Sequence, residues 1–234
     1  MFSVVVPVMN RTERIIPCLS TWIDHQYIGE VVIVDWSSKI PIFSDDSVSE
    51  IIHHPKTRVV RVNDEDSFIC MSFSLNVGIF NATLDHVVKI DIDYKLINEQ
   101  LLEAFYRSRN TKSFYCGTIP KKYDFHGFSF FPRQDFIAIN GYNERIRGWG
   151  FDDEDFYRRM EKRGLERIVI MNIEQFLYHI PHDDALRTVN YPQKDKNETN
   201  RVNEKIIQEY DCGCLSTYTT LCKTNKYTEL VRNK

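Results

Sequence analysis

Residues 86–93 have the sequence HVVKIDID, and this stretch decides the fold and the place of the functional site. The apolar run 86–90 is typical of a buried strand. Side chains alternate across a strand, so the carboxylates of Asp91 and Asp93 point to the same side. In an open α/β sheet the ligand crevice lies at the carboxyl ends of the parallel strands. Because neighbouring like charges need compensation, the pair indicates a divalent ion that carries a diphosphate.

Length and composition favour one soluble domain. The 234 residues are 42% hydrophobic and 13% aromatic, which is enough for a sizeable core. A net charge of -3 gives no sign of the basic surface that nucleic-acid binding needs, so we expect no nucleic-acid partner. No segment approaches the roughly 20 apolar residues of a membrane span, and no secretory leader precedes the first strand. We therefore expect a cytoplasmic or cytosol-facing chain, with peripheral membrane contact left open.

The six cysteines are scattered along the chain. We expect free thiols, with zinc binding or pairing left open for Cys212, Cys214 and Cys222 in the tail.

Short β-branched runs alternate with amphipathic stretches, which predicts βαβ units and a parallel sheet. Strands are expected over 3–8, 30–35, 57–62, 86–90, 128–131 and 168–173. Helices are expected over 11–24, 68–81 (with a gap around 76–78), 99–108, 133–140 and 152–162. The polar stretch 183–203 predicts a loop or lid, and the last twenty or so residues show no pattern. We expect a single domain over 1–234, divided into a nucleotide-binding half (1–110), an acceptor and catalytic half (111–205) and a tail (206–234).

Two further strand ends carry polar residues. The first strand leads into residues 7–11 (PVMNR), a turn whose backbone N–H groups suit an anion. Arg11 adds a charge-assisted contact to phosphate, although an ordinary turn with a solvated arginine explains the same residues. Asp35 ends the second strand, where a carboxylate suits a ribose hydroxyl or a base N–H; an N-cap explains it equally well.

The densest acidic cluster is residues 148–155 (GWGFDDED). Four consecutive acids at a helix start interact favourably with the helix dipole, but capping needs fewer than four. The flanking glycines let the backbone and Trp149 approach a ligand closely. Sugars offer apolar faces that stack on tryptophan and hydroxyls that suit carboxylates. The cluster therefore indicates a sugar site in which one acid is a general base toward a hydroxyl.

Residues 179–182 (HIPH) place two histidines three apart, and the proline excludes a helix between them. Imidazoles are common ligands of transition metals. An isolated pair of this kind is more often a surface histidine beside acids, but the upstream carboxylates favour a metal shell shared with them.

Five short motifs, in this order, resemble the GT-A glycosyltransferases, specifically the β-1,4-galactosyltransferase group and the related bacterial chondroitin-polymerase-like enzymes. They are the turn 7–11, LNVG at 75–78, GFS at 127–129, INGY at 139–142 and GWG at 148–150. The resemblance covers about residues 4–200. It implies a GT-A, Rossmann-like fold of nucleotide-diphospho-sugar transferases, with a central, mostly parallel twisted sheet and helices on both faces.

The resemblance also implies roles for single residues. The donor nucleotide would contact Pro7, Val8, Asn10, Arg11, Asp35, Asn76, Lys89 and Asp91, with Asp35 at the uridine and Asp91 near the ribose. Trp149, Gly150 and Asp152 would bind the donor sugar or the acceptor, and Asp153 would be the catalytic base. Asp93, His179 and His182 would hold Mn²⁺ or Mg²⁺ against the diphosphate of a UDP-sugar.

Three positions depart from the family pattern. The family's M-x-x-H metal motif is HIPH here, so an imidazole replaces a thioether, and Phe151 replaces the second glycine of G-W-G-G. The region around Asp124 does not match the galactose-type pattern, so the donor sugar is left unnamed. The resemblance implies an inverting, metal-dependent glycosyltransferase (a hexosyltransferase) that moves a sugar from a UDP-sugar to a hydroxyl on a glycan or glycoconjugate.

Three alternatives are left open. A retaining transferase of the polypeptide N-acetylgalactosaminyl type shares a similar acidic helix and a metal-site histidine. A sugar nucleotidyltransferase has the same kind of fold, but it usually carries a Gly-rich loop after the first strand, which residues 7–11 lack. A glycan-binding module without turnover is disfavoured by the presence of both the metal set and Asp153.

Overall fold

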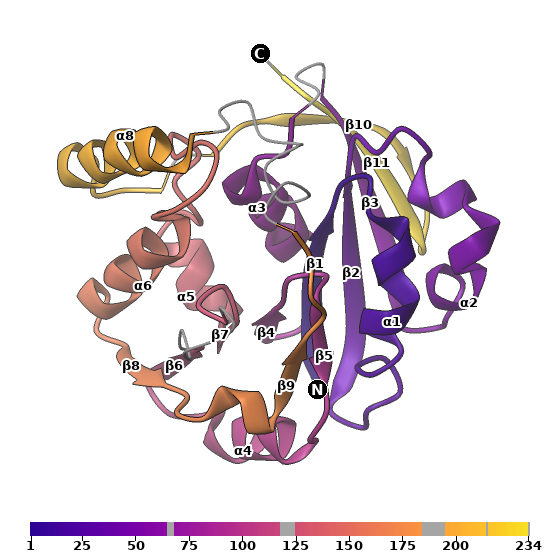
Figure 1. Cartoon of the computed structure of the whole chain (residues 1–234), viewed down its shortest axis with the longest axis horizontal. Helices are drawn as coiled ribbons and strands as arrows, with labels where there is room; N and C mark the ends of the chain where they lie inside the picture. Colours follow the sequence, from indigo (N-terminus) through magenta and orange to yellow (C-terminus); the bar gives the residue numbers. More distant parts are fainter. Residues whose placement is uncertain (65–67, 118–124, 184–194, 214, 234) are drawn as a thin grey trace.

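A nine-stranded sheet forms the centre of the protein (Figure 1). The computed structural model describes residues 1–64, 68–117, 125–183, 195–213 and 215–233. The strands are β1 (Phe2–Val8), β2 (Ile28–Trp36), β3 (Thr57–Asn63), β4 (His86–Lys89), β5 (Tyr94–Leu96), β6 (Ser113–Cys116), β7 (Ser129–Pro132), β8 (Glu166–Val169), β9 (Leu177–His179), β10 (Tyr218–Lys223) and β11 (Tyr227–Arg232). The helices are α1 (Ile15–Leu19), α2 (Ser49–Ile52), α3 (Met71–Asn81), α4 (Gln100–Ser108), α5 (Arg133–Ala138), α6 (Asp152–Lys162) and α8 (Lys196–Glu209).

The large sheet has the strand order β10-β11-β3-β2-β1-β4-β7-β6-β8, and β5 pairs with β9 in a separate ribbon. The neighbours from β11 to β4 are parallel. β7 runs antiparallel to both β4 and β6. The sheet is thus mostly parallel, as the sequence predicts.

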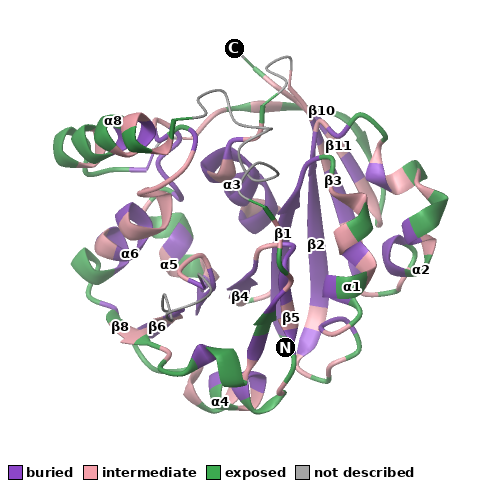
Figure 2. Ribbon diagram, viewed as in Figure 1, coloured by how far each residue is buried: buried purple, intermediate pink, exposed green. Residues whose placement is uncertain are grey.

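The central strands are buried on both faces, as Figure 2 shows for β1 and β2. Side chains of β1 alternate between two cores: Val4 and Val6 pack on the face that α1 covers, and Val5 packs on the face that α3 covers. Strands covered on both faces read as continuous apolar runs. This explains why the pattern of these strands is easy to recognise in the sequence.

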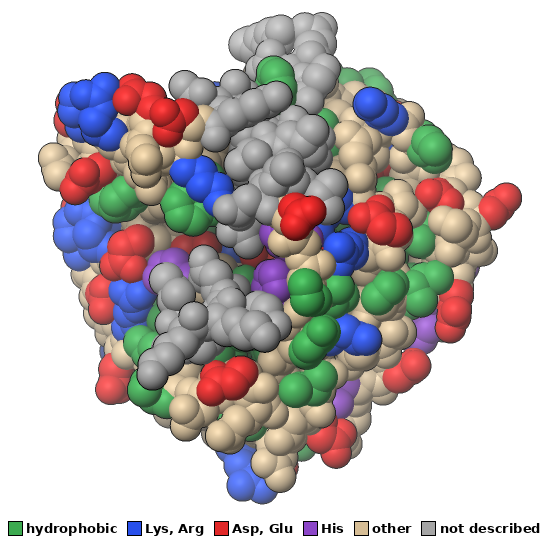
Figure 3. Space-filling model, in the orientation of Figure 1, with side chains coloured by type: hydrophobic (Ala, Val, Ile, Leu, Met, Phe, Trp, Pro, Cys, Tyr) green, Lys and Arg blue, Asp and Glu red, His purple; other side chains and the backbone are tan. Residues whose placement is uncertain are grey.

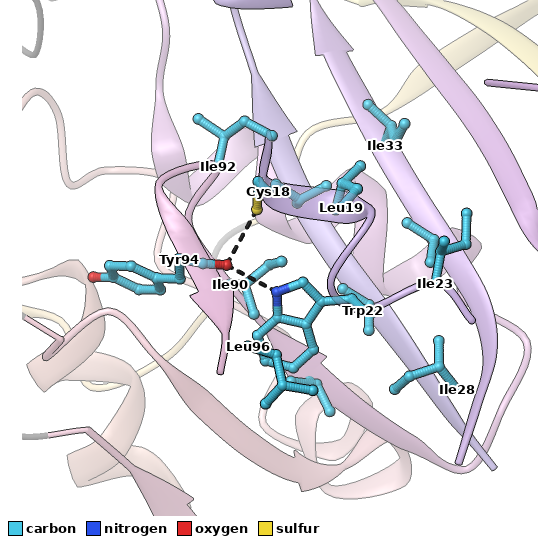
Figure 4. Packing of buried hydrophobic residues seen from close by; sticks show 14 of the residues in the cluster. Cys18, Leu19, Trp22, Ile23, Ile28, Ile33, Ile90, Ile92, Tyr94 and Leu96 are labelled. Atoms are coloured by element: carbon cyan, nitrogen blue, oxygen red, sulfur yellow. Dashed lines mark hydrogen bonds between the residues drawn. The ribbon is translucent and has the colours of Figure 1, made fainter. Parts of the chain in front are cut away.

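Helix α1 fixes the backbone just after β4. Cys18 and Trp22 both donate hydrogen bonds to the carbonyl oxygen of Tyr94, at 3.2 and 2.8 Å (Figure 4). Both side chains are fully buried. The two bonds hold the turn over residues 91–94 against the first core, so the carboxylates at the end of β4 project from a fixed backbone.

Helix α3 packs closely against the sheet at Gly78. A Cβ at Gly78 would lie 2.5 Å from Cγ1 of Val5 and 2.7 Å from Cγ2 of Val34. Packing at this distance offsets the low helix propensity of glycine. The helix therefore runs unbroken through residues 76–78, and the predicted gap there is wrong.

Several other predicted boundaries need correction. The helix expected over 11–24 is a 3₁₀ turn, η1 (Thr12–Arg14), followed by the five-residue α1. The strand expected over 168–173 is β8, which begins and ends earlier. Helix α6 has the bounds that the sequence predicts.

The polar stretch 183–203 is not a loop throughout. Residues 196–203 lie in α8, whose first turn is capped by the carboxylate of Asp195, an acceptor from the N–H groups of Asn197 and Glu198. The rest of the expected lid, 184–194, lies outside the described residues. The tail without a recognisable pattern forms β10 and β11, and β11 extends the parallel sheet beside β3.

The five cysteines within the described residues, Cys18, Cys70, Cys116, Cys212 and Cys222, are free. Among the described ranges, no helix has both the length and the apolar character that crossing a bilayer requires.

Candidate active site

A cavity opens at the carboxyl ends of β1 and β4. Figure 3 shows histidine and acidic side chains gathered around this hollow. Its lining includes most of the predicted site residues: Pro7, Val8, Arg11, Lys89, Asp91, Asp93, Trp149, Gly150, Asp152, Asp153, His179 and His182. Residues from both halves of the chain therefore meet in one place, where an open α/β sheet binds its ligand.

Asp93, His179 and His182 come together on one wall. One ligand atom from each lies within 4.8 Å of the others. The imidazole rings of His179 and His182 are 5.2 Å apart between centroids, and Nε2 of His182 lies 3.4 Å from Oδ2 of Asp93. Asp93 and His179 are buried.

The ribbon of β5 and β9 assembles this wall. Tyr94 pairs with His179 across the ribbon, and the N–H of Ile180 donates to the carbonyl oxygen of Asp93 at 2.8 Å. Backbone pairing thus brings together residues that lie 86 positions apart in the sequence. Pro181 then turns the chain so that His182 faces the same carboxylate.

The donor set suits a divalent transition-metal ion. One carboxylate and two imidazoles are ligands that Mn²⁺ and related ions accept. With bonds of about 2.1 Å, opposite ligand atoms around one ion lie about 4.2 Å apart, close to the spacing found here. The three side chains therefore fit a shared metal ion with small inward movements.

Arg11 is bound to the same carboxylate. Its two terminal nitrogens donate to the two oxygens of Asp93, each at 2.8 Å. Arg14 approaches Asp93 to 3.8 Å. A metal ion at Asp93 has to compete with Arg11 in this bidentate ion pair, since the ion and the guanidinium use the same carboxylate oxygens.

Asp153, the predicted base, lines the same cavity. Lys89 donates to its Oδ1 at 2.8 Å and the hydroxyl of Tyr142 donates to the same atom at 3.2 Å. Within the described residues no donor is bonded to Oδ2. Lys89 itself is 1% exposed. It lies beneath the acids, in contact with Asp153 and 3.9 Å from Asp91, rather than open to a nucleotide.

The four acids at the start of α6 divide into two pairs. Asp155 is fully buried and bonded to Arg159, and Glu154 accepts two bonds of 3.0 Å from Arg167. Asp152 and Asp153 line the cavity together with Lys89. Burial, assisted by the charge of Asp153, raises the pKa of Asp152 to about 7. Asp152 and Asp153 therefore remain as the acids available for chemistry.

Three predicted nucleotide contacts do not line the cavity. Asp35 is fully buried, where it accepts from Arg61, Ser38 and Ile42. Its role here is to hold the turn after β2, because both oxygens are used by these donors.

Asn76 is 2% exposed and bonds both the N–H and the carbonyl of Tyr142 as well as Glu144. Asn10, with φ of 53°, connects its turn to the segment after β2: its N–H donates to Oγ of Ser38, and its Oδ1 accepts from the N–H of Lys39. Both side chains support the cavity from behind, through the backbone they hold in place. The family motifs do not indicate the direction of these side chains.

The Gly-Trp-Gly loop is held by α8. Asn203 accepts from the N–H of Arg147 and donates to the carbonyl oxygens of Arg147 and Gly150. The ammonium of Lys196 lies 5.0 Å from the centroid of the Trp149 ring. Phe151 has φ of 70°, a left-handed conformation at the position where the resembled family has glycine.

Several residues of the site are missing from the sequence prediction. Tyr142 lies within the INGY motif but has no predicted role, and His126 and Gly127 line the cavity. Asn203 belongs to a stretch that reads as a polar loop. Only the family motif gave a signal for Tyr142; for Asn203 the sequence offers none.

Comparison with known proteins supports the same class. The family model for the N-terminal domain of galactosyltransferase matches residues 113–183. No curated protein matches the chain. The catalytic domain of Drosophila β1,4-galactosyltransferase 7, solved with xylobiose, matches with a TM-score of 0.63 and 19% identity over 99% of this chain and 92% of that chain. A mutant of that enzyme, solved with manganese, UDP-Gal and xylobiose, matches equally well.

Two more distant structures share the architecture. TarS from S. aureus, in complex with UDP-GlcNAc, has a TM-score of 0.63 and 15% identity over 78% of this chain and 59% of that chain. The mannosyltransferase PcManGT from Pyrobaculum calidifontis, in complex with GDP-Man and Mn²⁺, has a TM-score of 0.57 and 18% identity over 74% and 55%. The chain therefore has the GT-A fold of nucleotide-sugar-dependent glycosyltransferases.

Proposed function

We propose that the chain is a metal-dependent, inverting glycosyltransferase that moves a hexose from a UDP-sugar to a hydroxyl group of a glycan or glycoconjugate. The observation that carries the proposal is the meeting of Asp93, His179 and His182 at a cavity that Asp153 also lines. A metal site and a carboxylate base that face one pocket are what such a transfer requires.

The donor half of the reaction is assigned to the wall with Asp93. A bound Mn²⁺ or Mg²⁺ would supply charge neutralisation for the diphosphate that leaves. Arg11, already in this wall, would donate to the phosphate oxygens once it is released from Asp93. Pro7 and Val8 line the same side of the cavity and would face the nucleotide.

The acceptor half is assigned to the wall with Asp153. Its carboxylate would take the proton of the acceptor hydroxyl while that oxygen bonds to the anomeric carbon and the bond from this carbon to UDP breaks. Lys89 and Tyr142 hold one oxygen of Asp153, which leaves the other for the proton. General-base help of this kind contributes about 10²–10⁴-fold in rate.

The test is a screen for UDP release across UDP-sugars, with and without Mn²⁺, followed by determination of the anomeric configuration of the product. An inverted product that requires Mn²⁺ supports the proposal. Asp153→Asn should stop transfer and preserve UDP binding, whereas Asp93→Asn should abolish both metal binding and turnover. A retained configuration would instead favour a transferase of the polypeptide N-acetylgalactosaminyl kind, and near-full activity of Asp153→Asn would refute the assignment of the base.

A further inference from the structure

Three carboxylates of the cavity share one buried cation. Asp91 follows β4, and Asp152 and Asp153 begin α6. The ammonium of Lys89 lies 2.8 Å from Asp153 and 3.9 Å from Asp91. Among the described residues, Arg11, the other Lys or Arg of the cavity lining, is bonded to Asp93. Within the part of the chain that the structure describes, Lys89 is therefore the one lysine or arginine beside the acid cluster.

Glycine at position 127 allows this cluster to form. A Cβ at Gly127 would lie 3.0 Å from Nζ of Lys89, 3.1 Å from Oδ2 of Asp91 and 3.3 Å from Oδ2 of Asp153. The backbone of residue 127 thus covers the lysine closely and limits the access of water to it. Charge interactions are stronger in such a site because water screens them less.

We propose that Lys89 is a positioning residue for transfer: its ammonium fixes the carboxylate of Asp153 in the orientation of a base and offsets the charge of the neighbouring carboxyl groups of Asp91 and Asp152. This inference rests on the proposed function. Lys89 acts through Asp153 and has no contact with the acceptor in this scheme. Its buried location assigns it to the carboxylate instead of to the donor nucleotide.

Other groups that face Asp153 do not replace the lysine. Tyr142 donates to Asp153, and Tyr157 interacts with it electrostatically. Burial raises the pKa of each phenol well above its usual value, so both stay neutral. Cys116 also interacts with it, and burial raises the pKa of this thiol. Asp91 and Asp152 add negative charge, which disfavours ionisation of a neighbour. Loss of the lysine therefore removes the one cationic partner that Asp153 has among the described residues.

The test compares the pH dependence of kcat/KM for the wild type, Lys89→Met and Lys89→Arg. Methionine keeps the length of the side chain and removes the charge. An opposite charge at this distance lowers the pKa of a carboxyl group by about 1–3. When the charge is removed, the acidic limb of the Lys89→Met profile should therefore move to higher pH by about 1–3 pH units. Lys89→Arg should keep the acidic limb near its wild-type position. An unchanged limb in a folded Lys89→Met enzyme refutes the proposal.

Two further measurements keep the test decisive. If Lys89→Met folds poorly, Lys89→Met combined with Asp152→Asn is compared with Asp152→Asn alone, since this background carries one negative charge fewer. The titration of the Asp153 carboxyl carbon is followed by NMR without metal or donor, with its signal assigned from its loss in Asp153→Asn. It should move in the same direction in Lys89→Met. The NMR result tests Lys89 even if the wild type transfers no sugar, so failure of the proposed function and failure of this inference are distinguishable.

Discussion

Replacement of Arg11 by glutamine should tighten Mn²⁺ binding in the absence of nucleotide. Arg11 donates two hydrogen bonds of 2.8 Å to the oxygens of Asp93 that a metal ion needs. The Asp93 side chain is 4% exposed and that of Arg11 is 18% exposed, so water screens the pair only in part. The wild-type protein has to break this ion pair before the metal binds.

The size of the effect follows from the geometry. A hydrogen bond to a charged group contributes about 1.5–3 kcal/mol net. The two bonds together would contribute about 3–6 kcal/mol, and a discount of about half for the partial exposure of Arg11 leaves a cost of about 1.5–3 kcal/mol for breaking the pair. Since about 1.4 kcal/mol corresponds to a factor of ten, Arg11→Gln should bind Mn²⁺ about 10–100-fold more tightly than the wild type when no nucleotide is present.

The opposite effect is expected for the nucleotide. At saturating Mn²⁺, Arg11→Gln should bind UDP about tenfold more weakly, because a charge-assisted contact to phosphate is lost. The thermodynamic coupling between Mn²⁺ and UDP should therefore fall. Titration calorimetry with Mn²⁺ alone, and with UDP at saturating Mn²⁺, measures the two affinities.

Arg14 provides the matched control. It approaches Asp93 only to 3.8 Å, so Arg14→Gln should change Mn²⁺ affinity much less. Mn²⁺ binding to Arg11→Gln that is equal to or weaker than wild type, without nucleotide, would show that the guanidinium does not compete for the metal site.

Three further outcomes test other parts of the structure. Gly78→Ala should lower the free energy of unfolding by about 1–3 kcal/mol in chemical denaturation, since its Cβ would lie 2.5 Å from Val5. Burial raises the pKa of Asp152 to about 7, so the folded protein holds this proton to higher pH than the unfolded chain does. The free energy of unfolding therefore falls as the pH rises toward 7. Asp152→Asn should remove much of this decrease, as measured by unfolding curves without metal. Asn203→Ala should raise KM for the acceptor more than it changes UDP affinity, because it frees the backbone of Gly150; equal changes in both would contradict that role.

The elements that the sequence predicts correctly are those whose pattern depends on local burial. Strands β1 and β2 are apolar runs because both faces are covered. Helix α6 has an acidic first turn and ends near Gly164, and both signals are local. By contrast, β10 is largely exposed and β11 is only partly buried, so their pairing beside β3 left no distinct pattern in the sequence.

The direction of a side chain at a strand end could not be predicted in the same way. Asp35 and Asp93 are both carboxylates beside the carboxyl end of a parallel strand. The carboxylate of Asp35 accepts a hydrogen bond from Arg61 of β3, which lies 26 residues further along the chain. Asp93 lines the cavity. Which of the two lines the cavity depends on partners from other strands, and no local pattern encodes those partners.

The metal wall itself depends on the register of the β5 and β9 ribbon more than on any single contact. Tyr94 pairs with His179, and the N–H of Ile180 bonds to the carbonyl of Asp93. Because side chains alternate along a strand, a slip of one residue in this ribbon would turn the imidazole of His179 to the other face. The fixed spacing from His179 to His182 would then move the second imidazole as well. The buried bonds from Cys18 and Trp22 to Tyr94 thus secure the geometry of the metal site, although neither side chain is among its ligands.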